Sequence, residues 1–230
     1  MSPVVLGAIL GILAVARVVI WVAPVTVPND KQRSIVREYL DAFIIAGVVA
    51  LVLMHFVVRT FWIPSGSMLP TLKIHDVLLA NEIQYRLADP KDGQIAVFEP
   101  PPALGTTDFI KRVMAAPGDR FRVHNGQVYR NGVALREPYL AARPDYELEI
   151  RDYQIVVDGV PLDGAAGRAV VPPRAEWQAP DRIPRGYYLM LGDNRNDSDD
   201  GHLWGLLRRD QFVGHAFLVF WPFGDAKFLH

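Results

Sequence analysis

The sequence predicts a mostly β protein, with two N-terminal transmembrane helices followed by an extracytoplasmic antiparallel β domain. Two long apolar runs near the N-terminus predict the helices, and short β-branched and aromatic runs after residue 63 predict the domain. Half of the 230 residues are hydrophobic, and most of that excess lies before residue 63. The formal net charge of −1 gives no support to a nucleic-acid partner, and the absence of cysteine excludes thiol catalysis and disulfides.

The first apolar run is assigned to transmembrane helix 1, residues 1–23. Arg17 is its one charged residue, and its length is close to the roughly 20 residues that cross a bilayer. A cleaved signal peptide is the alternative, but no small-x-small site ends the run. Transmembrane helix 2 is placed at residues 42–62, whose apolar part, Ala42 to Val58, is near the lower limit for a span. A buried soluble helix is the alternative for this second run.

Residues 24–41, between the two runs, are predicted to form a cytoplasmic loop. Lys31, Arg33 and Arg37 lie in this segment, whereas no Lys or Arg precedes the first run. Positive charge concentrates on the cytoplasmic side of membrane proteins, so both termini are expected on the outer side.

Residues 63–230 are predicted to form one extracytoplasmic β domain. Asn-Gly and Asp-Gly pairs, which favour turns, separate several of its strand-like runs. These runs are residues 77–80, 94–98, 109–113, 120–124, 127–130, 154–157, 187–191 and 212–220. Residues 137–182 are more polar and proline-rich, which indicates an insertion or cap on the main sheet.

A serine-bearing segment, IPSGSMLPTL at residues 63–72, follows the second apolar run. Two prolines and a glycine favour a tight, irregular backbone, which suits presenting the Ser67 hydroxyl and nearby N–H groups to a carbonyl. A membrane-exit turn whose serines only cap or solvate the chain is equally compatible with this composition. The chain contains no G-x-S-x-G elbow, and Pro70 stands where an S-x-x-K motif would have its lysine.

Lys111 is the candidate base for Ser67. The other four lysines lie in the predicted cytoplasmic loop, close behind the serine, in a polar turn or in the C-terminal tail. Lys111 instead lies in the middle of a predicted strand, on the same face as Phe109 and Val113. If that face points inward, burial disfavours the ammonium ion and lowers the pKa of Lys111. An edge-strand lysine that faces solvent is the alternative.

The acidic loop, residues 192–205 (GDNRNDSDDGHLWG), follows the predicted strand 187–191. Calcium binding is the obvious alternative for so many oxygens, but the EF-hand template fails because its glycine is misplaced and Arg208 stands where the glutamate belongs. A buried hydrogen-bond network that orients the lysine is predicted instead, with Asp193 and Arg195 as supporting residues. A solvated polar loop is the alternative. No metal site and no cofactor are expected.

The runs PSGSMLPTL, FIKRVMAAPGD and GDNRNDSDDGHLWG, in that order, resemble those of the type I signal peptidases, the bacterial leader peptidase family. The resemblance implies a multi-pass enzyme of the bacterial inner (plasma) membrane, a serine endopeptidase that removes N-terminal signal peptides and cleaves after a small residue. Implied partners are preprotein signal peptides, membrane lipid and the export translocon. A narrower processing protease of the same fold, or a non-catalytic membrane-anchored β domain that binds translocated chains, are the alternatives.

Position by position, the resemblance implies a role for each motif residue. Ser67 resembles the nucleophile and Lys111 the general base, while Ser65 and the backbone N–H of Ser67 resemble the oxyanion hole. Ser198 resembles the residue that hydrogen-bonds the lysine, and Asp200 the carboxylate that supports the loop. The residues implied to line the pocket for small side chains are Ile63, Pro64, Met68, Leu72, Phe109 and Ile110.

Three places depart from the family pattern. His75 stands where glycine is usual, so the backbone there cannot use glycine-only angles cheaply. His202 replaces a usual arginine, which leaves its pairing with Asp200 in doubt. Asn196 and Asp197 reverse the more common order.

Overall fold

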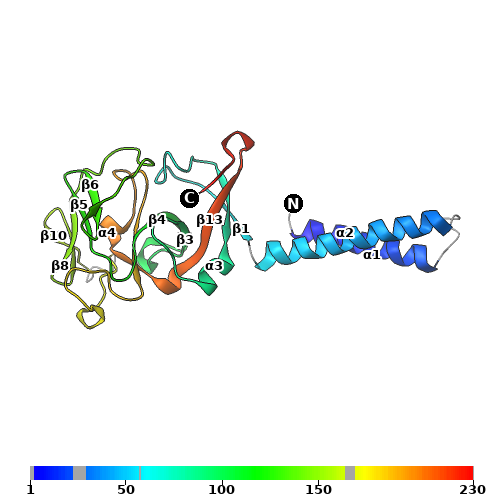
Figure 1. Cartoon of the computed structure of the whole chain (residues 1–230), viewed down its shortest axis with the longest axis horizontal. Coiled ribbons are helices and arrows are strands. Elements are labelled where there is room, and N and C mark those ends of the chain that lie inside the picture. The colour runs from blue at the N-terminus through cyan, green and yellow to red at the C-terminus, as the bar shows by residue number, and fades with distance from the viewer. Residues whose placement is uncertain (1–2, 23–29, 57, 164–168, 230) are drawn as a thin grey trace. The chain divides into compact units, whose positions relative to one another are not determined.

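The computed structural model describes residues 3–22, 30–56, 58–163 and 169–229 (Figure 1). The chain divides into two compact units, Met1–Arg59 and Thr60–His230. The first unit contains two helices, α1 (Pro3–Val22) and α2 (Asp30–Phe56). Arg17 of α1 pairs with Asp41 of α2, with 2.8 Å between Nε and Oδ1.

The prediction of two transmembrane helices is wrong. Within the described residues, no helix is both long enough and apolar enough to cross a membrane. The helix α2 begins at Asp30, so its first half is charged, and its apolar part from Ala42 to Phe56 falls short of the roughly 20 residues required. The end of the second predicted span is instead a strand, β1 (Val58–Trp62).

The predicted multi-pass topology is therefore not supported, whereas the cytoplasmic placement of residues 24–41 stays a prediction. Residues 30–41 of the predicted loop belong to α2. The remainder of the predicted loop between the helices, residues 24–29, lies outside the described part of the chain.

The second unit is built on two antiparallel sheets, which confirms the β part of the prediction. The first sheet has the order β1-β2-β13-β3-β4-β11-β12, and β14 pairs with β13. Its strands after β1 are β2 (Val77–Asn81), β3 (Ile95–Phe98), β4 (Phe109–Ala115), β11 (Tyr187–Leu191), β12 (Leu206–Arg208), β13 (Phe212–Trp221) and β14 (Lys227–Phe228). Two short helices, α3 (Glu82–Leu87) and α4 (Gly201–Trp204), accompany it.

The second sheet has the order β10-β9-β8-β5-β6-β7 and lies on the side of the first sheet away from β13 (Figure 1). Its strands are β5 (Phe121–His124), β6 (Gln127–Arg130), β7 (Val133–Ala134), β8 (Leu148–Arg151), β9 (Gln154–Val157) and β10 (Val160–Pro161). Residues 137–182 therefore supply three strands of this sheet. Asn125, Asn131 and Asp158 adopt positive φ before a glycine, as expected for the tight turns that the sequence indicates.

The central strand β4 brings two charged side chains into the interior. It pairs with β3 on one side and β11 on the other, and it is buried from Lys111 to Ala115. Successive residues of a strand point to opposite faces, so Lys111 and Arg112 enter different sides of the sheet. Their exposed fractions are only 5% and 3%. Each charge therefore requires a polar partner on its own face.

His75 occupies a left-handed turn, at φ 75°, where the family pattern has glycine. Two features hold it there. Its ring stacks on Trp62 with centroids 5.5 Å apart, and its N–H donates to the Ile63 carbonyl at 2.9 Å. The backbone thus adopts the glycine-favouring angle despite the side chain, and the turn fixes the start of the serine segment.

Candidate active site

The serine segment, residues 63–72, is anchored by buried apolar side chains. Ile63, Met68 and Leu72 belong to the core cluster that includes strands β2 and β13. Backbone hydrogen bonds from Leu69 to Gly66 (3.0 Å) and from Leu72 to Met68 (2.8 Å) close tight turns between the anchors. The hydroxyl-bearing part of the segment is left facing outward as a consequence.

Lys111 and Ser67 are hydrogen-bonded. Lys111 Nζ donates to Ser67 Oγ at 2.7 Å, although the two residues are 44 positions apart. Burial lowers the pKa of Lys111, while the carboxylates of Asp200, Asp199 and Asp193 oppose that effect. A lysine that reaches its neutral form at this distance can accept the serine proton.

Ser65 lies beside the same hydroxyl. Its Oγ donates to Ser67 Oγ at 3.4 Å, and the side chain of Ser65 is exposed. A hydroxyl next to the attacking oxygen is suitably placed to donate to the oxyanion that forms there. The oxyanion role remains a prediction from the resemblance.

Ser198 differs from the expectation that it hydrogen-bonds the lysine. Its side chain is 8% exposed, and its Oγ has no hydrogen-bond partner among the described residues. It nevertheless lines the same cleft as Lys111 and Ser67. The hydroxyl is buried against Gly192, where a Cβ would stand only 2.3 Å from it and 2.5 Å from the Ser67 carbonyl oxygen. Only a glycine permits this close approach.

Asp200 organises the C-terminal half of the acidic loop. It is fully buried, and it accepts hydrogen bonds from the Gly192 N–H at 2.8 Å and from the His202 N–H at 3.1 Å. His202 Nδ1 also lies 2.7 Å from Asp200 Oδ1. The imidazole therefore pairs with Asp200 at the position where the family usually has an arginine. The His202 ring stacks on Tyr146, with centroids 4.4 Å apart.

Asp193 and Arg195 each form an ion pair with a residue outside the acidic loop. Asp193 accepts both Arg112 Nε (2.8 Å) and Arg112 Nη2 (2.6 Å), and it also accepts Thr71 Oγ1 of the serine segment. Arg195 pairs with Glu137. The sequence indicated Asp193 and Arg195 as supporting residues but did not indicate these partners. Among the described residues, no group of three or more His, Asp or Glu side chains could hold a metal ion.

Sequence reasoning missed Asn194, which holds the serine backbone. Its N–H donates to the Ser67 carbonyl at 3.1 Å, and its Nδ2 donates to the Gly66 carbonyl at 3.1 Å. Arg112 was also missed, although a charged residue in an otherwise apolar strand was a usable signal. Nothing local to Asn194 distinguished it from its polar neighbours.

Ser65, Ser67, Lys111 and Ser198 line a cleft of about 850 Å³. The lining does not include Arg112, Asp193, Asn194, Arg195 or Asp200. One wall is apolar and comes from β1, the serine segment and β4; the other is polar and comes from the acidic loop. Of the six predicted pocket residues, all but Leu72 line the cleft, namely Ile63, Pro64, Met68, Phe109 and Ile110. Leu72, the last residue of the serine segment, is fully buried instead.

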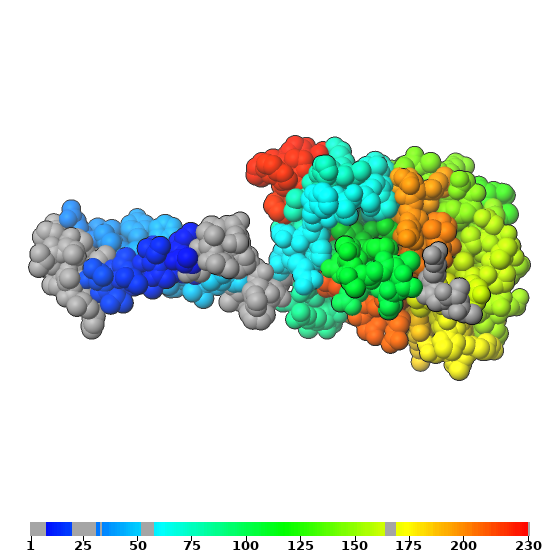
Figure 2. All heavy atoms as spheres, turned by 180° about the vertical axis from the view of Figure 1, so that it is seen from behind, coloured from blue at the N-terminus to red at the C-terminus, as the bar shows by residue number. Residues whose placement is uncertain are grey.

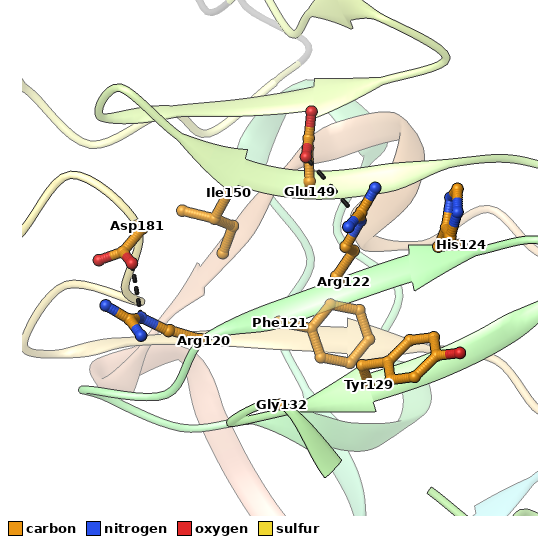
Figure 3. Close-up of a pocket in the computed structure, with 9 residues that line it drawn as sticks. All are labelled: Arg120, Phe121, Arg122, His124, Tyr129, Gly132, Glu149, Ile150 and Asp181. Atoms are coloured by element: carbon orange, nitrogen blue, oxygen red, sulfur yellow. Dashed lines mark ion pairs between the residues drawn. The ribbon is translucent and has the colours of Figure 1, made fainter. Parts of the chain in front are cut away.

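A second hollow, of about 460 Å³, lies on the second sheet (Figure 3). Its two outward arginines are paired with carboxylates: Arg120 lies 2.5 Å from Asp181, and Arg122 lies 4.0 Å from Glu149. Its lining contains neither a serine nor a lysine. The serine–lysine chemistry therefore belongs to the larger cleft.

Known proteins with similar sequences share one description. The family described as "Signal peptidase, peptidase S26" matches residues 36–221. A probable signal peptidase I-2 of Synechocystis sp. is 39% identical over 189 residues, covering 80% of this chain and 73% of that protein. The signal peptidase I of Leptolyngbya laminosa is 34% identical, covering 84% of each chain. Signal peptidase IB of Staphylococcus aureus is 32% identical, covering 83% of this chain and 92% of that protein.

A solved signal peptidase I from Enterococcus faecalis superposes only loosely on this chain. The TM-score is 0.37, with 25% sequence identity over 56% of this chain and 97% of that one. The relationship of this chain to the signal peptidases therefore rests on the sequence comparisons.

Proposed function

The chain belongs to the signal peptidase family, peptidase S26, and we propose that Ser67 and Lys111 form its catalytic dyad. It is a serine endopeptidase that removes signal peptides from preproteins. The observation that carries the dyad is the 2.7 Å contact between Ser67 Oγ and the Nζ of a buried lysine. A serine far from every candidate base would instead have favoured a non-catalytic binding domain.

The dyad accounts for acyl transfer in two steps. Ser67 Oγ attacks the scissile carbonyl carbon while neutral Lys111 takes up the hydroxyl proton. As the C–N bond breaks, Lys111 returns that proton to the leaving amine, and the acyl group stays on Ser67. Lys111 next removes a proton from water, whose oxygen attacks the ester carbon. As the bond to Ser67 Oγ breaks, Lys111 gives that proton to the serine oxygen, which releases the signal peptide and restores the dyad.

The surrounding residues supply charge stabilisation and selectivity in this proposal. The oxyanion is held by the Ser65 hydroxyl and the Ser67 N–H. The wall that includes Ile63, Met68 and Phe109 offers an apolar surface for the side chain before the cleaved bond.

We propose that the second unit acts at a membrane surface, on the outer side of a bacterial inner membrane. Large apolar side chains are exposed where β1 and the ends of β13 and β14 lie: Trp62, Ile74, Trp221, Phe223 and Phe228. Two contacts join these positions. Trp62 stacks on His75, and Lys73 pairs with Asp225 next to Phe223. Aromatic side chains favour the membrane–water interface, where signal peptides emerge. A translocon partner stays a prediction.

Two substitutions test the dyad. We expect Ser67→Ala and Lys111→Ala each to abolish cleavage of a preprotein in detergent, because one removes the attacking oxygen and the other its base. Lys73→Ala, at a lysine that lies near the serine in sequence but pairs with Asp225, serves as the control and should retain activity. Wild-type cleavage by Lys111→Ala would contradict the dyad.

A further inference from the structure

Residues 137–146, here called the strap, run along the acidic loop without forming a helix or strand of their own. In Figure 2 the orange region that contains the acidic loop lies between the cyan serine segment and the yellow-green second sheet. The strap connects β7 to β8 of that sheet. It therefore joins a sheet that bears no dyad residue to the loop that flanks the dyad.

The strap holds the first half of the acidic loop through a buried ion pair. Glu137 contacts Arg195 through both carboxylate oxygens, and the second contact, from Nη1 to Oε2, measures 3.3 Å. The side chains of Arg195 and Glu137 are 0% and 4% exposed. A backbone bond from the Ala141 N–H to the Asp193 carbonyl, at 3.3 Å, lies next to this pair.

The strap also contacts the loop at two further places, Asn196 and His202. Asn196 Nδ2 donates to the Arg143 carbonyl at 3.1 Å, and Asn196 Oδ1 accepts the Asp145 N–H at 3.1 Å. Next along the strap, Tyr146 stacks almost parallel to the His202 ring, with an interplanar angle of 8°. The strap thus touches the loop from Asp193 to His202.

A short series of contacts leads from Glu137 to the dyad. Arg195 Nε donates to the Gly192 carbonyl at 2.9 Å, and the Gly192 N–H donates to Asp200. Both sides of this glycine are therefore fixed. Its Cα faces the Ser67 carbonyl and Ser198 with no room for a methyl group. A displacement of Gly192 would therefore also displace the backbone of Ser67, the nucleophile.

The pairing also compensates the buried charge of Arg195. Burial alone lowers the pKa of Arg195, but the hydrogen bond and charge of Glu137, with smaller contributions from Tyr146 and Tyr139, raise it, and the net direction is upward. Neither Glu137 nor Tyr146 lines the substrate cleft. Any effect of these two residues on catalysis must therefore act through the loop.

We infer that Glu137 and Tyr146 are positioning residues of the peptidase, and that the strap sets the acidic loop against the dyad. The inference rests on the proposed function, because it assigns the strap to the Ser67–Lys111 site. It makes the second sheet a support for catalysis in addition to a structural layer.

The test compares Glu137→Gln and Tyr146→Leu with two matched controls in the full chain, using a peptide substrate and temperatures below each variant's Tm. Glu147→Gln removes an exposed carboxylate that pairs with His124, away from the loop. Tyr146→Phe keeps the stacked ring and removes a hydroxyl that has no partner among the described residues. Misplacement near a reacting centre lowers rates steeply, so we expect kcat to fall about ten- to a hundredfold in the two test variants, with KM unchanged within about twofold. Both controls should stay within about twofold of wild type.

The pH profile separates positioning from a loss of fold. The charges of Asp200, Asp199 and Asp193 in the loop all raise the pKa of Lys111, so a displaced loop should move the acid limb of kcat/KM in Glu137→Gln. The limb should not move in Glu147→Gln. Folded Glu137→Gln and Tyr146→Leu with wild-type kcat and an unmoved limb would overturn the inference. The proposed function would fail separately, if Ser67→Ala still cleaved the peptide.

Discussion

Lys111 combines a structural cost with a catalytic use. Its pKa is lowered by burial, whereas in the unfolded chain it titrates near 10.4. Between the folded pKa and about 10.4 the unfolded chain binds more protons, so the free energy of unfolding rises with pH across that window. At neutral pH this buried amine therefore destabilises the fold. A residue kept at such a cost is expected at a functional position.

Lys111→Met should separate the two effects. We expect it to abolish peptide cleavage and yet to raise the free energy of unfolding at pH 7 by on the order of 1 kcal/mol, because an apolar side chain replaces one that is costly to bury. Urea denaturation at pH 7 and pH 10 measures this. The stabilisation should shrink at the higher pH, and a variant less stable than wild type at both pH values would contradict the assignment.

Asp199 tunes the base from an exposed position. After burial and the charge of Asp200, its carboxylate is a further influence on Lys111, and it raises the pKa. Asp199→Asn should therefore lower the pKa of Lys111 and shift the acid limb of kcat/KM to lower pH. A pH–rate profile checks the direction. Asp210→Asn, which alters an exposed carboxylate paired with Arg208, is the control and should leave the limb in place.

Some site residues could be predicted singly and others could not. Ser67 and Lys111 lie in recognisable local runs, so sequence alone was enough to nominate them. The partners Arg112 and Asp193 are 81 positions apart, and Arg195 and Glu137 are 58 apart. Such pairs form only when the fold brings the two segments together. No local sequence pattern predicts which distant residues will then be in contact.

At the scale of elements, the acidic loop is held closely against the serine segment. Asn194 bonds the backbone of Gly66 and Ser67, and Asp193 accepts the Thr71 hydroxyl. Gly192 is where the two segments approach most tightly, since a Cβ there would overlap the Ser67 carbonyl. The hydrogen-bond network predicted from the loop's composition is thus joined to the nucleophile's own segment.

Gly192→Ala should damage both activity and stability. The added methyl group meets backbone oxygen at 2.5 Å, so either the loop or the serine segment must move. We expect a loss of about 1–3 kcal/mol in the free energy of unfolding and at least a hundredfold loss in kcat. Gly224→Ala has open space around its Cβ and should change neither quantity measurably. Equal behaviour of the two variants in denaturation and peptide cleavage would refute the close-contact argument.

The β elements and the helical elements were predictable to different degrees. The β-branched and aromatic runs and the Asn-Gly or Asp-Gly turns located most of the longer strands of both sheets. They missed β8, in the middle of the second sheet, and the two-residue strands β7 and β10. The N-terminal runs misled because apolar content alone was used to set their limits. The helix α2 extends back through charged residues to Asp30, and β1 replaces its expected end.

At the scale of the whole molecule, every proposed site residue lies in the second unit, Thr60–His230. A chain that begins at Val58 keeps all of β1 and should fold cooperatively. Its kcat/KM on a short soluble peptide should stay within about threefold of the full chain, because the dyad, the cleft and the strap are all present. Circular dichroism and peptide cleavage measure the outcome. A folded but inactive fragment would mean that Met1–Arg59 contributes to catalysis.

The central claim is that a neutral Lys111 serves as the base for Ser67. Its most direct test is the titration of the Lys111 side chain by NMR in the folded enzyme, with Lys111→Met used to assign the signal among the five lysines. The account predicts a pKa below the ordinary value of about 10.4, coincident with the acid limb of kcat/KM. A Lys111 that titrates at the ordinary value, in an enzyme that is fully active at neutral pH, would contradict it.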